Sequence, residues 1–145
     1  MTAYNFYSNA EINKIGKQAT ATPGDTSTIT VRRGICDTTK QNLDNTEIAQ
    51  VVPIFAGEVV LDIWAFVATA DATSNAALDL GFAGGAEGEA NGVITTANHI
   101  LHNEAFVPLY FAANNYVTLV PQNSVAVDAA VIEVCAIVTK AFSKI

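Results

Sequence analysis

The clearest strand signal is the nearly continuous hydrophobic run over residues 59–69, which only Asp62 and Thr69 interrupt or end with polar side chains. Because side chains point alternately to the two faces of a β-strand, this run predicts one long strand. One face would hold core residues, namely Val59, Leu61, Ile63, Ala65 and Val67. The opposite face would carry Trp64 and Phe66 beside Asp62, so both faces need cover. We expect a sandwich interior behind the first face, and a loop, an arm or a neighbouring subunit over the second.

Shorter runs that alternate or are rich in β-branched residues precede and follow this strand. They span residues 26–35, 47–54, 76–82, 104–111, 116–120 and 125–138. Turn residues separate them, and only residues 93–103 are compatible with a helical turn or a short helix. Short strands between turns predict an all-β chain that folds as an antiparallel β-sandwich or jelly-roll-like domain. Its core would also include Leu78, Leu80, Leu109 and Val134.

The N-terminal segment lacks a sustained hydrophobic period. Tyr4, Phe6 and Tyr7 are its apolar anchors among polar residues. This composition suits an extended N-terminal arm that orders against a partner, and a frayed terminus is the alternative. We therefore divide the chain into an arm with the first strand, residues 1–40, and a β-sandwich body, residues 41–145.

Charge is distributed unevenly along the chain, whose net charge is −7. Between Lys40 and Lys140 there are eleven acidic residues and no lysine or arginine. Residues 1–40 hold five of the seven basic residues, among them Lys14 and Lys17. An acidic body does not favour binding to nucleic acid. Only 14% of residues are charged and 50% are hydrophobic, which favours a subunit of a larger assembly over a free monomer.

Two motifs could hold a metal ion, and neither is complete. His99 and His102 form an H-x-x-H pair, but no third ligand follows at a recognisable spacing. Residues 85–92 place Glu87 and Glu89 in a glycine-rich loop, yet the loop lacks the acidic start and the closing glutamate of a calcium site. We expect a polar loop and a solvated turn, with no metal and no cofactor.

The residues also argue against an enzyme. No serine lies in a G-x-S-x-G elbow, and Cys135 lies in an apolar run that disfavours a thiolate. Arg32 and Arg33 would point to opposite faces of one strand, so they form no phosphate-binding patch. The spacing of Cys36 and Cys135 does not establish a disulfide, and we expect two thiols.

The length and the hydropathy of the chain indicate one soluble domain. A domain of 145 residues buries enough surface to fold without a disulfide or a metal. The N-terminus lacks the basic and apolar regions of a signal peptide. The longest apolar stretch, residues 51–70, is interrupted by Pro53, Gly57, Glu58 and Asp62, so we expect no membrane span and synthesis in a cytoplasm.

Several phrases resemble a pattern found in head proteins of tailed bacteriophages. The run VPIFAGEVVLD at 52–62 resembles I-P-A-G-x-V-V-x-x-V, and ALDLGF at 77–82 resembles T-L-D-V-G before a small acidic loop. The runs VPLYFA and YVTLV, with the closing strand at 130–140, complete the order. The resemblance covers roughly residues 50–140 and not the arm. The loop has glutamates where the pattern has aspartates, which weakens any metal role for it.

The resemblance implies a capsid decoration or cement protein. Such a subunit is a non-enzymatic virion structural protein, made in the host cytoplasm, that binds the outer surface of the assembled capsid and stabilises it. Its partners would be the major capsid protein and further copies of the chain, as in a trimer. From composition and patterning, the partner interface would comprise Tyr4, Phe6, Tyr7, Lys14, Lys17, Trp64 and Phe66. The alternatives are a head- or tail-fibre attachment protein and a β-sandwich carbohydrate-binding module that uses Trp64 and Tyr110.

Overall fold

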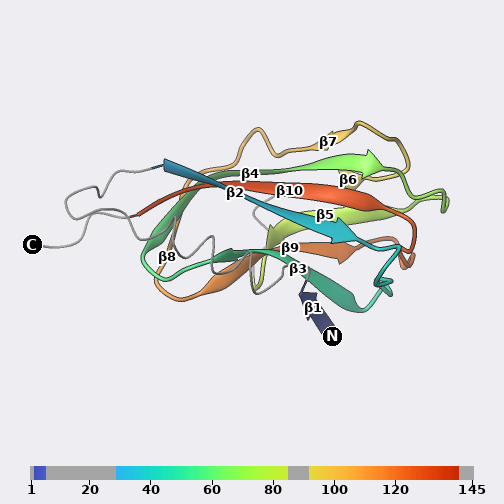
Figure 1. The fold of residues 1–145 in the computed structure, drawn as a ribbon, viewed down its shortest axis with the longest axis horizontal. Helices are drawn as coiled ribbons and strands as arrows, with labels where there is room; N and C mark the ends of the chain where they lie inside the picture. The colour runs from blue at the N-terminus through green and yellow to red at the C-terminus, as the bar shows by residue number, and fades with distance from the viewer. Residues whose placement is uncertain (1, 6–28, 85–91, 141–145) are drawn as a thin grey trace, which may run out of the picture.

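A computed structural model describes residues 2–5, 29–84 and 92–140 of the chain. All regular elements in these ranges are β-strands (Figure 1). They are β1 (Thr2–Asn5), β2 (Ile29–Asp37), β3 (Glu47–Ile54), β4 (Glu58–Thr69), β5 (Ala77–Phe82), β6 (Gly92–Val93), β7 (Ile100–Leu101), β8 (Leu109–Phe111), β9 (Asn115–Pro121) and β10 (Val131–Lys140). The all-β prediction is confirmed. The stretch 93–103 contains turns and short strands, and no helix.

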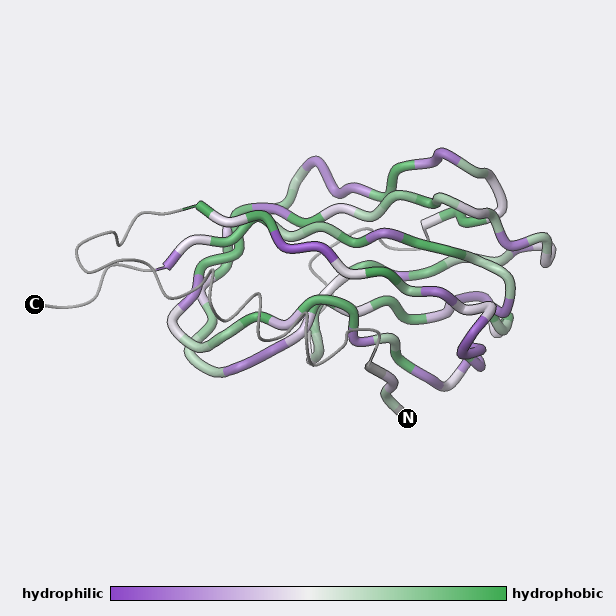
Figure 2. The backbone as a smooth tube through the Cα atoms, viewed as in Figure 1, coloured by the Kyte–Doolittle hydropathy of each residue, from purple (hydrophilic) through white to green (hydrophobic). Residues whose placement is uncertain are grey.

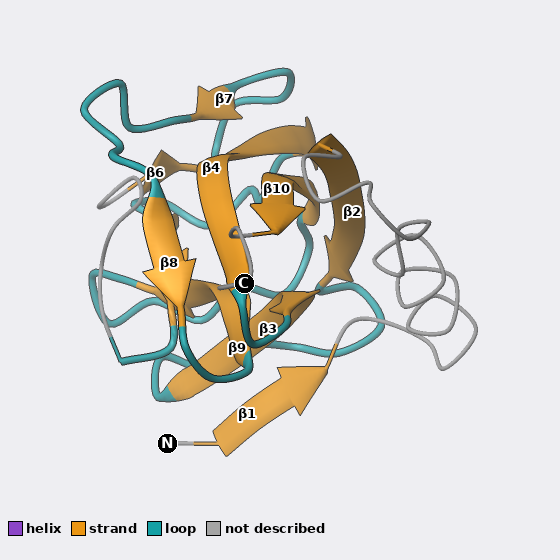
Figure 3. Cartoon of the chain, turned by 90° about the vertical axis from the view of Figure 1, so that its left-hand side faces the viewer, coloured by secondary structure: helices purple, strands orange, loops and turns teal. Residues whose placement is uncertain are grey.

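The strands form two sheets that face each other, as the end-on view in Figure 3 shows. One sheet has the order β1-β3-β9-β5-β6, and the other has the order β2-β10-β4-β7 with β8 also paired to β4. All pairs are antiparallel except β1 with β3. Successive strands from β2 to β5 alternate between the sheets, and β10 returns between β2 and β4. This is jelly-roll order, one of the two arrangements predicted from the sequence.

The hydrophobic core lies between the sheets. Its largest fully buried apolar side chains are Leu43, Ile54, Ile63, Leu78, Leu80, Ile94, Leu101, Leu119 and Ile132. The predicted core positions Leu78, Leu80 and Val134 are confirmed. Leu109 is only partly buried and packs against the edge of this cluster. No helix in the described ranges is long and apolar enough to cross a membrane.

A β-bulge in β4 changes which residues face the core. Ile137 pairs with Asp62, whereas the next residue, Val138, pairs with Val60. Leu61 is therefore an extra residue without a partner on β10, and the alternation shifts by one position there. Ile63, Ala65 and Val67 are buried as predicted, but Val60 is buried on the other side of the bulge. The prediction was wrong for Val59 and Leu61, which are half-buried.

Polar contacts close one end of the sandwich around Asp71, which is fully buried. One carboxylate oxygen accepts the Thr73 N–H at 2.8 Å, and the other accepts the N–H groups of Asp128 and Ala129 at 3.0 and 3.1 Å. Burial alone would raise the pKa of Asp71. The hydrogen bonds from Thr73, Asp128 and Ala129 outweigh burial and hold the pKa below its ordinary value of 3.8. This carboxylate therefore ties the end of β4 to the segment that leads into β10.

Candidate interaction surface

The outward face of the β2-β10-β4-β7 sheet is the main apolar surface of the described residues, and we call it the outer face. Hydrophobic residues predominate along β4 and β10, as the hydropathy colours of Figure 2 show. The register aligns the outward side chains in rows. The rows are Ile35-Glu133-Phe66-Ile100, Arg33-Cys135-Trp64, Val31-Ile137-Asp62 and Ile29-Thr139-Val59-Tyr110.

Five of the seven strongly exposed large hydrophobic residues in the described ranges lie on the outer face. These five are Ile29, Val31, Ile35, Ile100 and Tyr110, exposed by 60%, 49%, 49%, 58% and 60%. The other two, Val93 and Val107, lie elsewhere. Exposed apolar side chains gathered on one face of a sheet, here with Glu133, Arg33 and Asp62 among them, mark a candidate site of interaction.

Trp64 and Phe66 lie within this surface, as the strand pattern predicted. Trp64 is opposite Cys135 on β10, and Phe66 lies between Glu133 and Ile100. Both aromatic side chains are half-buried by their neighbours. The isoleucines and valines of β2 complete the surface, and sequence reasoning did not group them with Trp64. Their alternation was visible, but only the pairing of β2 with β10 places them on the same face.

The outer face carries one notable polar pair. The Nε2 atom of His102 lies 2.9 and 3.0 Å from the two carboxylate oxygens of Asp62, and both side chains are about one-third exposed. His99, the other histidine of the H-x-x-H motif, is exposed. The described residues contain no group of three or more His, Cys, Asp or Glu side chains placed to hold a metal ion. The loop residues Glu87 and Glu89 lie outside the described residues.

The arm residues are only partly described. Tyr4 lies in β1, packs partly buried against the chain's own core, and donates its hydroxyl to the Glu47 carboxylate. That hydrogen bond raises the pKa of Tyr4 and lowers the pKa of Glu47. Phe6, Tyr7, Lys14 and Lys17 lie outside the described residues. The first strand that was grouped with the arm, β2, forms one edge of the sandwich.

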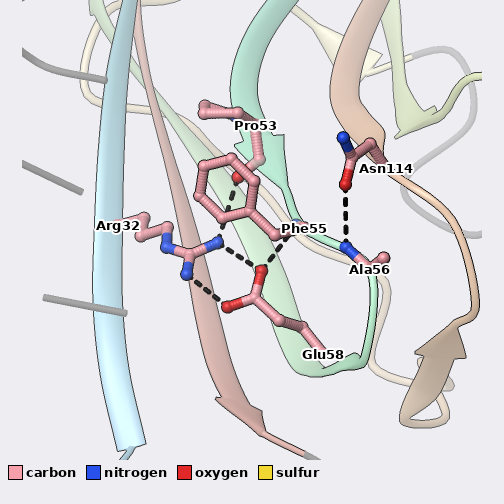
Figure 4. Close-up of polar contacts among 6 residues, drawn as sticks. All are labelled: Arg32, Pro53, Phe55, Ala56, Glu58 and Asn114. Atoms are coloured by element: carbon pink, nitrogen blue, oxygen red, sulfur yellow. Dashed lines mark hydrogen bonds and ion pairs between the residues drawn. The ribbon is translucent and has the colours of Figure 1, made fainter. Parts of the chain in front are cut away.

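A buried ion pair lies beneath the outer face at the start of β4 (Figure 4). Arg32 Nη1 donates to Glu58 Oε1 at 2.7 Å and to the Pro53 carbonyl at 3.1 Å, while Nη2 donates to Glu58 Oε2. The Phe55 N–H donates to the same carboxylate at 2.6 Å, and the guanidinium lies 5.0 Å from the Phe55 ring centroid. Arg32 is 1% exposed and Arg33 is exposed, so the two arginines point to opposite faces as predicted.

The ion pair has a structural role. Its groups are buried and bonded to each other, so they are not available to a ligand in solution. The pair joins β2 to β4 within one sheet and holds the turn that arrives from β3 in the other.

Neither thiol is set up for catalysis. Cys36 and Cys135 are both buried free cysteines, and they lie on different faces of the same sheet. Burial raises the pKa of Cys36 to about 12, and burial likewise raises the pKa of Cys135. Thiols with raised pKa values are poor nucleophiles at neutral pH.

Three chains from phage capsids have a similar structure, at low sequence identity. A chain of the Ralstonia phage GP4 capsid matches with a TM-score of 0.62 and 15% identity, over 88% of this chain and 94% of that chain. A chain of the cyanophage Pam1 capsid matches with a TM-score of 0.60 and 16% identity, over 85% and 92%. A chain of the acid-stable capsid of Helicobacter pylori bacteriophage KHP30 matches with a TM-score of 0.50 and 19% identity, over 83% and 93%.

No family model matches the chain, and no curated protein matches it either. At these identities the likeness to the three capsid chains is a likeness of fold. It extends over nearly the whole of each of them.

Proposed function

We propose that this chain is a virion structural protein that binds the outer surface of an assembled bacteriophage capsid and stabilises it as a decoration or cement subunit. The observation that carries the proposal is the shared fold with chains of three phage capsids, over most of their length. The sequence resemblance to phage head proteins points in the same direction. In this proposal the chain is not an enzyme, and its main partner is the major capsid protein.

The composition of the outer face supports a protein partner. Its most exposed residues are aliphatic, with isoleucines at positions 29, 35 and 100, and its aromatic residues lie between them. Aromatic residues and arginine are enriched in protein interfaces, and the outer face carries Trp64, Phe66 and Arg33. We place Trp64 and Phe66 at an interface with a second copy or with the capsid, and a trimer of this chain would fit a symmetric lattice.

Stabilisation of the capsid would follow from mass action. A subunit that binds the assembled lattice and not its separated parts stabilises the assembly by RT ln(1 + [L]/Kd) per site. Several linked subunits in one oligomer raise the apparent affinity further, because the second contact is intramolecular. Weak contacts through the outer face can therefore have a large effect when repeated over a shell.

The arm would add a second contact in this proposal. Phe6 and Tyr7 would supply aromatic anchors, and Lys14 and Lys17 would aid encounter with an acidic lattice. Replacing Phe6 and Tyr7 with alanine, without touching β1, should weaken capsid binding and leave the body folded. If this double variant decorates capsids as well as the wild-type protein does, the docking surface lies on the sandwich alone.

The decisive experiment is sedimentation of the purified protein with capsids of the virus that encodes it. The protein should sediment with intact capsids and not with unassembled capsid protein. Val31→Lys should reduce this binding, because Val31 lies on the outer face at 49% exposure. Val93→Lys is a matched control on the other sheet at 46% exposure, and it should bind as the wild type does. Failure of the wild type to bind any capsid form would refute the proposal.

A carbohydrate-binding module is the second candidate, and one arrangement favours it. Trp64 and Tyr110 lie on the same face as Asp62 and His102, whose side chains are about one-third exposed. Aromatic rings pack on sugar rings, and carboxylates accept hydrogen bonds from sugar hydroxyls. Retention of the wild-type protein on a glycan array, lost in Trp64→Ala, would support this candidate. A head- or tail-fibre attachment protein would instead bind at a few capsid sites rather than over the whole shell.

A further inference from the structure

The N-terminal strand occupies a specific place at the edge of a sheet. β1 pairs in parallel with β3, with Thr2 opposite Glu47, Ala3 opposite Ile48, Tyr4 opposite Ala49 and Asn5 opposite Gln50. The ring of Tyr4 packs against the core, and its hydroxyl donates to Glu47. Glu47 also accepts the Asp44 N–H at 2.7 Å, which holds the carboxylate in place. We call the edge of β3 that pairs with β1, including the Glu47 carboxylate, the β1 slot.

The chain between β1 and β2 is long enough to reach a neighbouring molecule. Residues 6–28 amount to 23 residues between the last residue of β1 and the first residue of β2. A chain of that length can span up to about 75 Å. A domain of this size has a radius of gyration of about 15 Å. The length of the connection therefore does not restrict β1 to the slot of its own molecule.

We propose that β1 is exchanged between copies of this chain, so that β1 of one copy fills the β1 slot of its neighbour in the assembled oligomer. A second copy is the external occupant that fits, because the slot is complementary to β1 and every copy carries the same strand. It offers a parallel strand edge in the right register and an acceptor for the Tyr4 hydroxyl. An exchanged strand repeats every contact that the strand makes within one molecule.

The balance between the two arrangements would depend on local concentration. Because the contacts of β1 are the same in both, their free energies differ chiefly through the connection and through any new contact between the bodies. In dilute solution the molecule's own strand competes for the slot at the effective concentration that the length of its connection to β2 sets, typically in the millimolar range. Neighbours held together in an oligomer reach similar concentrations. Exchange would then link the copies without requiring a new binding surface.

The experiment uses cysteines at the paired positions 3 and 48 in separate copies. Neighbouring strands lie about 4.8 Å apart, within the range that a disulfide requires. Ala3 is exposed and Ile48 is half-buried, so both positions tolerate the change. Full-length Ala3→Cys protein with a mass tag is refolded together with untagged Ile48→Cys protein, concentrated, oxidised and run on a non-reducing gel. The native thiols are buried and should not react.

Exchange predicts a disulfide between a tagged and an untagged copy, identified by mass spectrometry as joining positions 3 and 48. The pair Ala3→Cys with Val93→Cys is the matched control, because β6 lies at the opposite end of the same sheet. It should give no such product. The double variant Ala3→Cys/Ile48→Cys shows whether pairing occurs within one molecule. If only that variant crosslinks, and only as a monomer at every concentration, the exchange proposal is wrong. Absence of the 3–48 disulfide in every sample refutes it equally, because β1 would then not occupy the slot.

This proposal is independent of the capsid function. The crosslink is measured on purified protein without capsids, so a negative result leaves the decoration proposal standing. Conversely, exchange could be found in a protein that binds no capsid.

Discussion

Arg32 on β2 and Glu58 at the start of β4 form a bidentate ion pair inside the sandwich, with side chains only 1% and 3% exposed. Removing one partner leaves a buried charge without compensation, which costs about 3–5 kcal/mol. Arg32→Met and Glu58→Gln should each lower the free energy of unfolding by that amount, measured by urea denaturation. The double variant Arg32→Met/Glu58→Leu should recover much of the loss, because a well-packed apolar pair can replace a buried ion pair.

The exposed ion pair of Lys40 and Asp37 is a control for this prediction. Its nitrogen–oxygen distance is 3.8 Å, and the lysine is 83% exposed. Lys40→Ala should change stability by less than about 1 kcal/mol. If Arg32→Met costs no more than Lys40→Ala, the buried pair does not stabilise the contact of β2 with β4 and the turn after β3.

Because of the bulge at Leu61, we expect alanine substitutions at Leu61 and Ile63 of β4 to lower the free energy of unfolding by different amounts. Ile63 is 1% exposed in the core, so Ile63→Ala should cost about 2–5 kcal/mol. Leu61 is half-buried, so Leu61→Ala should cost about 1 kcal/mol. Urea denaturation of both variants tests the order. A larger loss for Leu61→Ala would mean that β4 follows the uninterrupted alternation instead.

Asp71 should make the fold sensitive to acid. Its pKa in the folded protein lies below the value near 3.9 expected in the unfolded chain, so the folded state binds fewer protons. The stabilising contribution of the carboxylate is complete above the unfolded pKa and disappears as the pH falls through the lower folded pKa. Asp37 and Glu47 also have lowered pKa values and add to the effect with the same sign.

The variant Asp71→Asn separates this contribution from the others. At neutral pH it should lose about 1–3 kcal/mol, since the N–H groups of Asp128 and Ala129, which are partly buried, lose their charged acceptor. As the pH falls below about 4 and through the lowered folded pKa of Asp71, the stability of the variant should then fall less steeply than that of the wild type. Parallel pH profiles for the two proteins would contradict the assignment.

Gly34 lies where β2 approaches β3 closely. A Cβ atom at this position would lie 2.3 Å from the Val51 carbonyl oxygen and 2.8 Å from Val51 Cγ1. Gly34→Ala should therefore cost about 1–3 kcal/mol or more, because backbone must move to make room. Thermal unfolding measures the loss. A wild-type melting temperature would mean that the two sheets can separate at this point without cost.

Trp64 tests the role of the outer face directly. If Trp64 packs a contact between copies, Trp64→Ala should yield monomers in analytical ultracentrifugation while circular dichroism shows an unchanged fold. If Trp64 binds sugar, the same variant should keep its oligomeric state and lose glycan binding. A variant that keeps both properties would remove Trp64 from any interface.

Local patterning predicted what depends on neighbours in sequence. The alternation over residues 59–69 gave the strand β4 and placed Trp64 and Phe66 on one face. It did not predict the bulge, because Leu61 is apolar and suits either face. The aromatic pair was therefore identified correctly, while the core side of the same strand was wrong at two positions.

Features that depend on distant pairing were not visible in the sequence. Arg32 and Glu58 are 26 residues apart, and no local pattern indicates that one neutralises the other. Tyr4 was recognised as an anchor, but its parallel pairing beside β3 requires knowledge of the sheet order. The same holds for the apolar residues of β2, which join the outer face only through β10.

The position of β10 has a consequence for how the chain folds during synthesis. β10 is the last of the described strands along the chain, yet it lies between β2 and β4 in the middle of its sheet. In its pairing with β2, Val131 lies opposite Asp37 and Thr139 lies opposite Ile29. A long stretch of chain therefore separates the two residues of each pair. Until residues 131–140 have left the ribosome, no strand lies between β2 and β4. The backbone groups along their facing edges therefore remain unpaired. The nascent chain can therefore complete this sheet only after residues 131–140 have left the ribosome, and contacts between such distant residues form slowly.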